Sequence, residues 1–129
     1  MTDRLLVVED TENILQVITV CLEANGYEVH AVQDGLAAVE ETISWLPDLI
    51  VLDLLLPKMS GFLVLEALKQ DLRTREIPVL VMSAKAQEED IRRALTTGAA
   101  DYLVKPFHPR DLVQRIQTIL DIMKDGADQ

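Results

Sequence analysis

Cysteine, long apolar runs and basic residues are all scarce in this sequence of 129 residues. The single cysteine, Cys21, cannot form a disulfide within the chain, which favours a reducing compartment. Asp53 and Pro57 interrupt the longest apolar run, so no segment is long enough to cross a membrane. The first residues also lack the pattern of a signal peptide. We therefore expect a cytoplasmic domain that does not contact a membrane.

The balance of charge argues against one class of partner. The chain has 22 acidic and 12 basic residues, which gives a net charge of -10. An acidic surface of this kind repels phosphate backbones, so we expect no direct binding to nucleic acid.

Five short apolar runs predict β-strands, because they are rich in β-branched residues and are flanked by turn residues. They cover residues 5–8, 27–32, 49–52, 79–82 and 102–104. The third and fourth runs do not alternate apolar with polar residues. Continuous apolarity indicates burial on both faces, as in a parallel sheet.

Amphipathic stretches between these runs predict five helices. They cover residues 14–22, 35–44, 62–72, 88–97 and 112–123. Asn25-Gly26 and Gly98 are typical helix ends and terminate the first and fourth helices. The length suits one domain, which we place at residues 1–123. A polar C-terminal tail follows at residues 124–129, and we expect it to be frayed.

Five alternating strand–helix units predict an α/β fold in which a parallel sheet carries helices on both faces. Such sheets bind ligands beyond the carboxyl ends of their strands, near the point where strand order reverses. No glycine-rich phosphate loop follows the first strand, which argues against a nucleotide site. The residues directly after each strand are therefore the candidates for chemistry.

Charged and polar residues follow four of the five predicted strands. They are Glu9 and Asp10, then Asp53, then Ser83, and finally Lys105. Converging carboxylates repel one another unless a cation neutralises them, and an all-oxygen ligand set favours Mg²⁺. A carboxylate beside Mg²⁺ and a lysine can attack phosphorus, and both cations then offset charge on the transferred group. A serine hydroxyl can donate a hydrogen bond to the same oxygens.

With these residues in place, the sequence resembles the receiver domains of response regulators, which act in two-component signalling. The resemblance extends from residue 4 to residue 123 and depends on the joint order and spacing of six segments. They are Val7-Val8-Glu9-Asp10, Asp34-Gly35, Asp53-Leu54-Leu55-Leu56-Pro57 with Gly61, Met82-Ser83-Ala84, Gly98-Ala99-Ala100-Asp101-Tyr102 and Lys105-Pro106-Phe107. The resemblance implies a flavodoxin-like, doubly wound (βα)5 fold with strand order 2-1-3-4-5.

The same resemblance implies a phosphorylation switch. Asp53 would accept a phosphoryl group from a sensor histidine kinase or a phosphotransfer protein, and Lys105 would contact that group and pair with Asp53. Glu9, Asp10, Asp53 and the backbone carbonyl of Leu55 would hold Mg²⁺. The domain would not be an enzyme toward outside substrates, since it would catalyse only its own phosphorylation and dephosphorylation.

Further positions take their roles from the resemblance alone. Ser83 would move toward the phosphoryl group, Tyr102 would rotate inward with it, and the bond before Pro106 would be cis. Leu55 and Lys85 occupy positions that tune phosphoryl lifetime in this family. Because a leucine cannot orient water by hydrogen bonding, we expect slow autodephosphorylation.

The segment from Asp101 to Arg115, which includes Asp111, is similar to receivers of winged-helix transcription regulators. Those receivers pair through the face formed by the fourth helix, the fifth strand and the fifth helix. Asp101 and Arg115 match charged positions of that face. Uncharged residues replace three others: Ile91, Ala100 and Gln117. Since rim charges contribute little individually, a weak or phosphorylation-dependent homodimer remains open.

Two other functions compete with the switch. A metal-dependent phosphohydrolase would also form an aspartyl-phosphate, but such enzymes usually carry a second Asp two residues after the nucleophile, where this chain has Leu55. The alternative is an interaction module of the same fold that is never phosphorylated. Taken singly, Asp53 can be a strand terminator, Lys105 a solvated lysine and Ser83 a turn hydroxyl.

Overall fold

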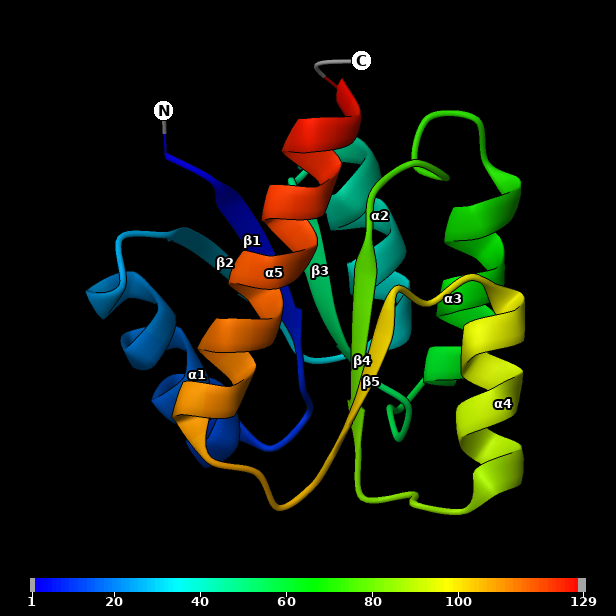
Figure 1. The fold of residues 1–129 in the computed structure, drawn as a ribbon. Helices are drawn as coiled ribbons and strands as arrows, with labels where there is room; N and C mark the ends of the chain where they lie inside the picture. Colours follow the sequence, from blue (N-terminus) through cyan, green and yellow to red (C-terminus); the bar gives the residue numbers. More distant parts are fainter. Residues whose placement is uncertain (1, 128–129) are drawn as a thin grey trace.

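The computed structural model describes residues 2–127 as five strands that alternate with five helices (Figure 1). The strands are β1 (Arg4–Val8), β2 (Glu28–Val32), β3 (Leu49–Asp53), β4 (Val79–Ser83) and β5 (Asp101–Val104). All four neighbouring pairs are parallel, and the sheet order is β2-β1-β3-β4-β5. The doubly wound fold and the strand order implied by the resemblance are both confirmed.

The helices cover both faces of the sheet (Figure 1). They are α1 (Glu12–Ala24), α2 (Gly35–Trp45), α3 (Gly61–Gln70), α4 (Glu88–Thr97) and α5 (Pro109–Ala127). One apolar cluster joins the sheet to α1 and α5, and a second joins it to α2, α3 and α4. Every residue of β3 and β4 is buried, as their continuous apolarity predicts.

The ends of α3 and α5 differ from the sequence-based expectations in opposite directions. Helix α3 ends at Gln70 rather than at residue 72, and Asp71 then accepts hydrogen bonds from the backbone and side chain of Arg73. Helix α5 continues to Ala127, so residues 124–127 are helical and not frayed. Lys124 reaches Asp3 at 3.0 Å, which ties this last turn to the start of the chain. Residues 128–129 lie outside the described part, and the domain boundary at residue 123 stays a prediction.

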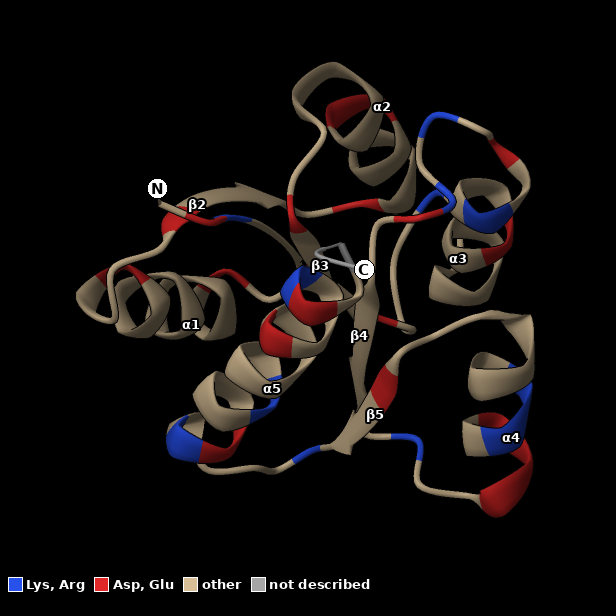
Figure 2. Cartoon of the chain, turned by 45° about the horizontal axis from the view of Figure 1, so that its top comes forward, with Lys and Arg blue, Asp and Glu red and all other residues tan. Residues whose placement is uncertain are grey.

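Charge and chain ends complete the architecture. Figure 2 shows acidic residues on all five helices, so the negative charge is distributed and not gathered on one element. The start of β1 and the end of α5 lie at the edge where the strands begin (Figure 1). The opposite edge, where the strands end, carries the candidate site. No helix within residues 2–127 is long and apolar enough to span a membrane.

Candidate functional site

Three acids meet at the edge where β1 and β3 end. Glu9 and Asp10 directly follow β1, and Asp53 is the last residue of β3. The two strands are neighbours and run parallel, so their carboxyl ends lie side by side. Each acid offers a carboxylate oxygen within 4.8 Å of the others. The structure therefore brings together the three acids that the sequence predicts.

The loop after Asp53 is drawn close to the strand by Gly61. The Gly61 N–H donates to the carbonyl of Leu54 at 2.9 Å. A Cβ at position 61 would overlap the backbone of Asp53 and Leu54, so only glycine fits without a backbone shift. The N–H of Leu55 donates to Asp53 Oδ1 at 3.0 Å, which orients that carboxylate.

Lys105 lies between two of the acids. Its Nζ donates to Asp53 Oδ2 at 2.7 Å and to Glu9 Oε1 at 2.6 Å. A backbone hydrogen bond holds the lysine in place, because the Lys105 N–H donates to the Ser83 carbonyl at 2.8 Å. The bond between Lys105 and Pro106 is cis. The contact with Asp53 agrees with the prediction. The contact with Glu9 was not expected, since only tertiary packing shows that the longer acid reaches the ammonium.

Burial sets the protonation chemistry of this pair. Glu9 is fully buried, and desolvation together with the neighbouring Asp53 raises its pKa from 4.5 to about 7, although Lys105 opposes the shift. Burial lowers the pKa of Lys105, but its hydrogen bonds with Asp53 and Glu9 outweigh burial and leave that pKa raised. Lys105 therefore stays charged and provides the positive charge that the buried acids need.

The donor set fits a small hard cation. Glu9 Oε2 is buried and has no hydrogen-bond partner among the described residues, so one carboxylate oxygen is available for a ligand. Asp10 is exposed at the edge of the same cluster and leaves one side open to water. Three carboxylates with room for water are the ligands that Mg²⁺ prefers. These residues are thus compatible with Mg²⁺.

Ser83 and Tyr102 are connected through the loop after β4. Ser83 Oγ is buried and accepts the N–H of Lys85 at 3.1 Å, and the Tyr102 hydroxyl donates to the Lys85 carbonyl at 2.7 Å. Tyr102 is only 7% exposed, and this burial raises the pKa of its hydroxyl. Its ring thus already lies inward, the position that the resemblance associates with the phosphorylated form. The Lys85 ammonium lies 3.9 Å from Asp90 of α4.

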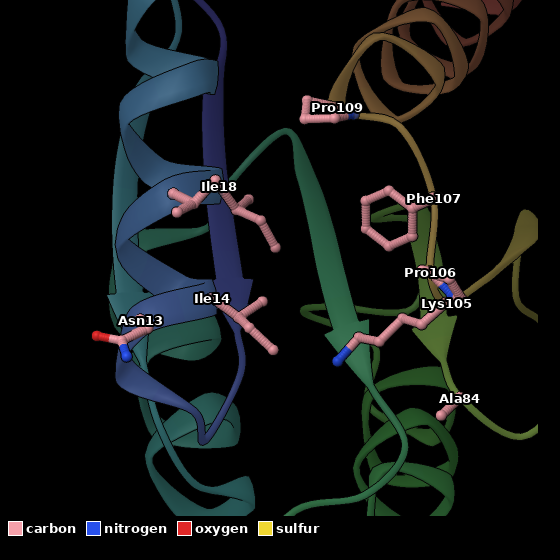
Figure 3. Close-up of a pocket in the computed structure, with 9 residues that line it drawn as sticks. Asn13, Ile14, Ile18, Ala84, Lys105, Pro106, Phe107 and Pro109 are labelled. Atoms are coloured by element: carbon pink, nitrogen blue, oxygen red, sulfur yellow. The ribbon is translucent and has the colours of Figure 1, made fainter.

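Sequence reasoning missed an apolar groove beside the acids. It lies between α1 and the loop that joins β5 to α5, and its volume is about 460 Å³. Figure 3 shows Ile14 and Ile18 of α1 pointing toward Phe107, with Lys105 extending into the space between them. Ile14 and Val17 are 38% and 60% exposed, although both belong to the apolar stripe that predicts this helix. The sequence signal for this groove is the width of the apolar stripe on α1, which has more apolar residues than packing against the core requires.

On the predicted dimer face, two of the charged residues already pair with each other within the chain. Arg115 Nη1 lies 2.8 Å from Asp101 Oδ2 within the same chain, and both side chains are about one-third or more exposed. Ile91 is half-buried against the core, whereas Asp111 is exposed. A shallow hollow between β5 and α5 contains Asp101, Asp111 and Arg115. A homodimer through this face stays a prediction.

Comparison with known proteins gives one consistent answer. The family model described as the response regulator receiver domain matches residues 5–117. The phosphate regulon transcriptional regulatory protein PhoB of Klebsiella pneumoniae is 42% identical over 120 residues, which cover 93% of this chain and 52% of that protein. The chain thus spans about half the length of the curated relatives it matches.

Solved structures agree in fold. A putative response regulator from Chloroflexus aurantiacus is 31% identical, with a TM-score of 0.89 and coverage of 94% of this chain and 99% of that one. The receiver domain of a sensor histidine kinase from Pseudomonas aeruginosa PAO1, which has a magnesium ion coordinated in its active site cleft, is 30% identical with a TM-score of 0.86. It covers 94% of this chain and 99% of its own. This chain belongs to the response regulator receiver domain family, the phosphorylation-regulated signalling domains of two-component systems.

Proposed function

We propose that Asp53 is the phosphoacceptor of this receiver domain. The observation that carries the proposal is the placement of Asp53, whose two oxygens accept from Lys105 Nζ at 2.7 Å and from the Leu55 N–H at 3.0 Å. These two donors orient the carboxylate at the sheet edge where ligands bind. Asp10 is exposed, and one oxygen of Glu9 accepts from Lys105.

The chemistry follows from these contacts. An Asp53 oxygen attacks the phosphorus of a phosphohistidine, the phosphorus–nitrogen bond breaks, and its electron pair leaves on the imidazole nitrogen. Lys105 offsets charge on the phosphoryl oxygens during transfer. Mg²⁺ held by Glu9, Asp10, Asp53 and the Leu55 carbonyl would supply further positive charge for the same oxygens.

The groove beside Lys105 suits the phosphodonor protein. Its walls are apolar and come from α1 and the segment after β5, so a helix that carries a phosphohistidine can pack there. Ile14 and Val17 provide exposed apolar contacts next to the reacting groups. We therefore propose a histidine kinase or phosphotransfer protein as the donor, in the reducing cytoplasm that the free thiol of Cys21 favours.

Intact-mass analysis with acetyl phosphate and Mg²⁺ tests the site. We expect the wild type to gain one phosphoryl group and Asp53→Asn to gain none. Asp121→Asn, which changes an exposed acid on α5, serves as the matched control and should react like the wild type. Equal modification of wild type and Asp53→Asn would refute the assignment. No gain by the wild type, where a control receiver reacts, would favour the unphosphorylated interaction module.

We further propose that the phosphoryl group is long-lived. Leu55 is 50% exposed beside the acceptor, and its apolar side chain cannot position an attacking water. The Lys85 ammonium is turned toward Asp90 at 3.9 Å, so it is not free to hold water at Asp53. Decay of the modified wild type should be slower than decay of Leu55→Asn. A wild-type lifetime of seconds would contradict this proposal.

The same proposal extends to the output. The surface formed by α4, β5 and α5 would change on phosphorylation and control a partner, an output domain or a second copy of the chain. Asp101 and Arg115 already pair within the chain, which leaves fewer charges for a dimer and supports weak association. Sedimentation velocity at several protein concentrations, with and without acetyl phosphate, measures this association. A sedimentation coefficient that is independent of both variables would exclude the dimer.

A further inference from the structure

Helix α4 is held to the rest of the domain by few apolar contacts. Half of its ten residues are charged, and Ala94 is its one fully buried side chain. Ile91 is only half-buried against the core. A helix with so little buried apolar area gains little packing energy, so single polar contacts contribute a large share of its attachment.

One such contact joins α4 to α3, its neighbour in Figure 1. The guanidinium carbon of Arg93 lies 4.0 Å from the centroid of the Phe62 ring. No carboxylate within residues 2–127 forms an ion pair with Arg93, so its charge is directed at the ring. Phe62 is 7% exposed and cannot easily move away, whereas Arg93 lies on the exposed side of α4. This geometry is a cation–π contact.

Phe62 connects this contact to the phosphoryl site. It follows Gly61, which packs against the backbone of Asp53. It also belongs to the apolar cluster that contains Tyr102 and Ala94. The inward ring of Tyr102, Phe62 and the buried side of α4 therefore pack in a single cluster, and a shift of α4 would disturb all three.

We propose that Arg93 and Phe62 form a latch that holds α4 in the arrangement compatible with an inward Tyr102. The latch stabilises the phosphorylated form and so sets how readily the domain becomes phosphorylated; this role depends on the proposed function of Asp53. Phosphorylation can shift the domain only by the difference in free energy between its unphosphorylated and phosphorylated arrangements. Weakening the latch makes the phosphorylated arrangement less stable, so a higher phosphodonor concentration is needed to phosphorylate half of the protein.

Arg93→Met tests the latch, because it keeps the apolar stem and removes the charge. Arg92→Met is the matched control on the same helix, where the arginine is exposed and, within residues 2–127, pairs with Glu88 alone. In the unmodified protein, we expect Arg93→Met to speed amide hydrogen exchange across residues 88–97. With acetyl phosphate and Mg²⁺, the concentration for half-maximal phosphorylation should rise roughly two- to fivefold, the size of an exposed cation–π contact.

A double-mutant cycle with Phe62→Leu separates the latch from loss of packing. Phe62→Leu keeps an apolar side chain but removes the ring, so Arg93→Met should loosen α4 less in the Phe62→Leu background than in the wild type. Additive effects of the two changes, or equal behaviour of Arg93→Met and Arg92→Met, would overturn the proposal. Hydrogen exchange needs no phosphorylation, so it still tests the latch if Asp53 proves not to be the acceptor.

Discussion

The two carboxylate oxygens of Glu9 lie in different environments. One oxygen accepts from Lys105 at 2.6 Å, and the other is buried without a partner among the described residues. A buried charge that is only partly satisfied lowers the stability of the folded state. We therefore expect pH and a bound cation to change the stability of this domain through Glu9.

Without Mg²⁺, Glu9 should make stability depend on pH. Its pKa is about 7 in the folded protein and 4.5 as the ordinary value, so the folded state binds more protons between these limits. The free energy of unfolding should therefore fall as pH rises from about 4.5 to about 7, by on the order of 1–3 kcal/mol. Urea unfolding across this range measures the effect. Glu9→Gln should flatten the slope, whereas Glu12→Gln, an exposed acid, should keep it; equal slopes in wild type and Glu9→Gln would contradict the expectation.

Gly61 is a second residue whose replacement should affect both fold and site. A Cβ there overlaps the backbone of Asp53 and Leu54, so Gly61→Ala must shift the loop after β3. We expect a loss of stability of roughly 1–3 kcal/mol, as for overpacked sites, and slower phosphorylation by acetyl phosphate. Gly126→Ala is the matched control, because a Cβ at Gly126 meets nothing within 4 Å. A Gly61→Ala protein as stable and reactive as that control would contradict the argument.

Helices α1 and α2 both begin after a residue type that favours helix starts, but only one of the two side chains caps its helix. Asp34 caps α2 with its side chain, which accepts the N–H of Ala37 at 2.8 Å. Thr11 is the N-cap residue of α1, but its hydroxyl accepts no hydrogen bond from the first turn of that helix. Both residue types favour helix starts, so only the structure tells which side chain contributes.

Replacing the two caps with alanine should separate them. Asp34→Ala should lower the free energy of unfolding by about 1 kcal/mol, because one N–H of the first turn loses its acceptor. Thr11→Ala should change it by much less. Chemical denaturation of both variants measures the difference, and equal losses would mean that propensity rather than the hydrogen bond matters.

For the whole molecule, the excess of negative charge means that the acids at the strand ends lower the stability of the folded state when no cation is bound. The chain carries a net charge of -10, and three of its acids lie within 4.8 Å of one another. Lys105 neutralises only part of that cluster. Binding of a cation to the folded state alone must therefore raise the stability of the whole domain.

Removal of Mg²⁺ with a chelator should lower the melting temperature. At a Mg²⁺ concentration 100 times the dissociation constant, the gain in stability would be about 2.7 kcal/mol. Asp10→Asn should lose most of this gain, since it removes an exposed carboxylate that we propose as a ligand, without disturbing the Lys105 pairs. NaCl at matched ionic strength is the control for screening. If Mg²⁺ stabilised Asp10→Asn as much as the wild type, the acids would not be the metal site.

The order of strands and helices follows from local pattern, and with it the meeting of the strand ends. Parallel strands place their carboxyl ends at one edge, so Glu9, Asp53 and Lys105 had to converge once the strands were recognised. Local pattern does not set every helix end: α5 runs on to Ala127, and Lys124 near its end pairs with Asp3, a residue far away in sequence.

The sequence by itself determined the fold class, the family and the residues that gather at the site, because hydrophobic periodicity and motif order are local properties. Tertiary structure alone decided how those residues share their charges. It placed Lys105 on Glu9 as well as Asp53, buried Tyr102 against the Lys85 carbonyl and left Ile14 exposed beside the site. These outcomes depend on distances between elements far apart in the chain, which no local pattern records.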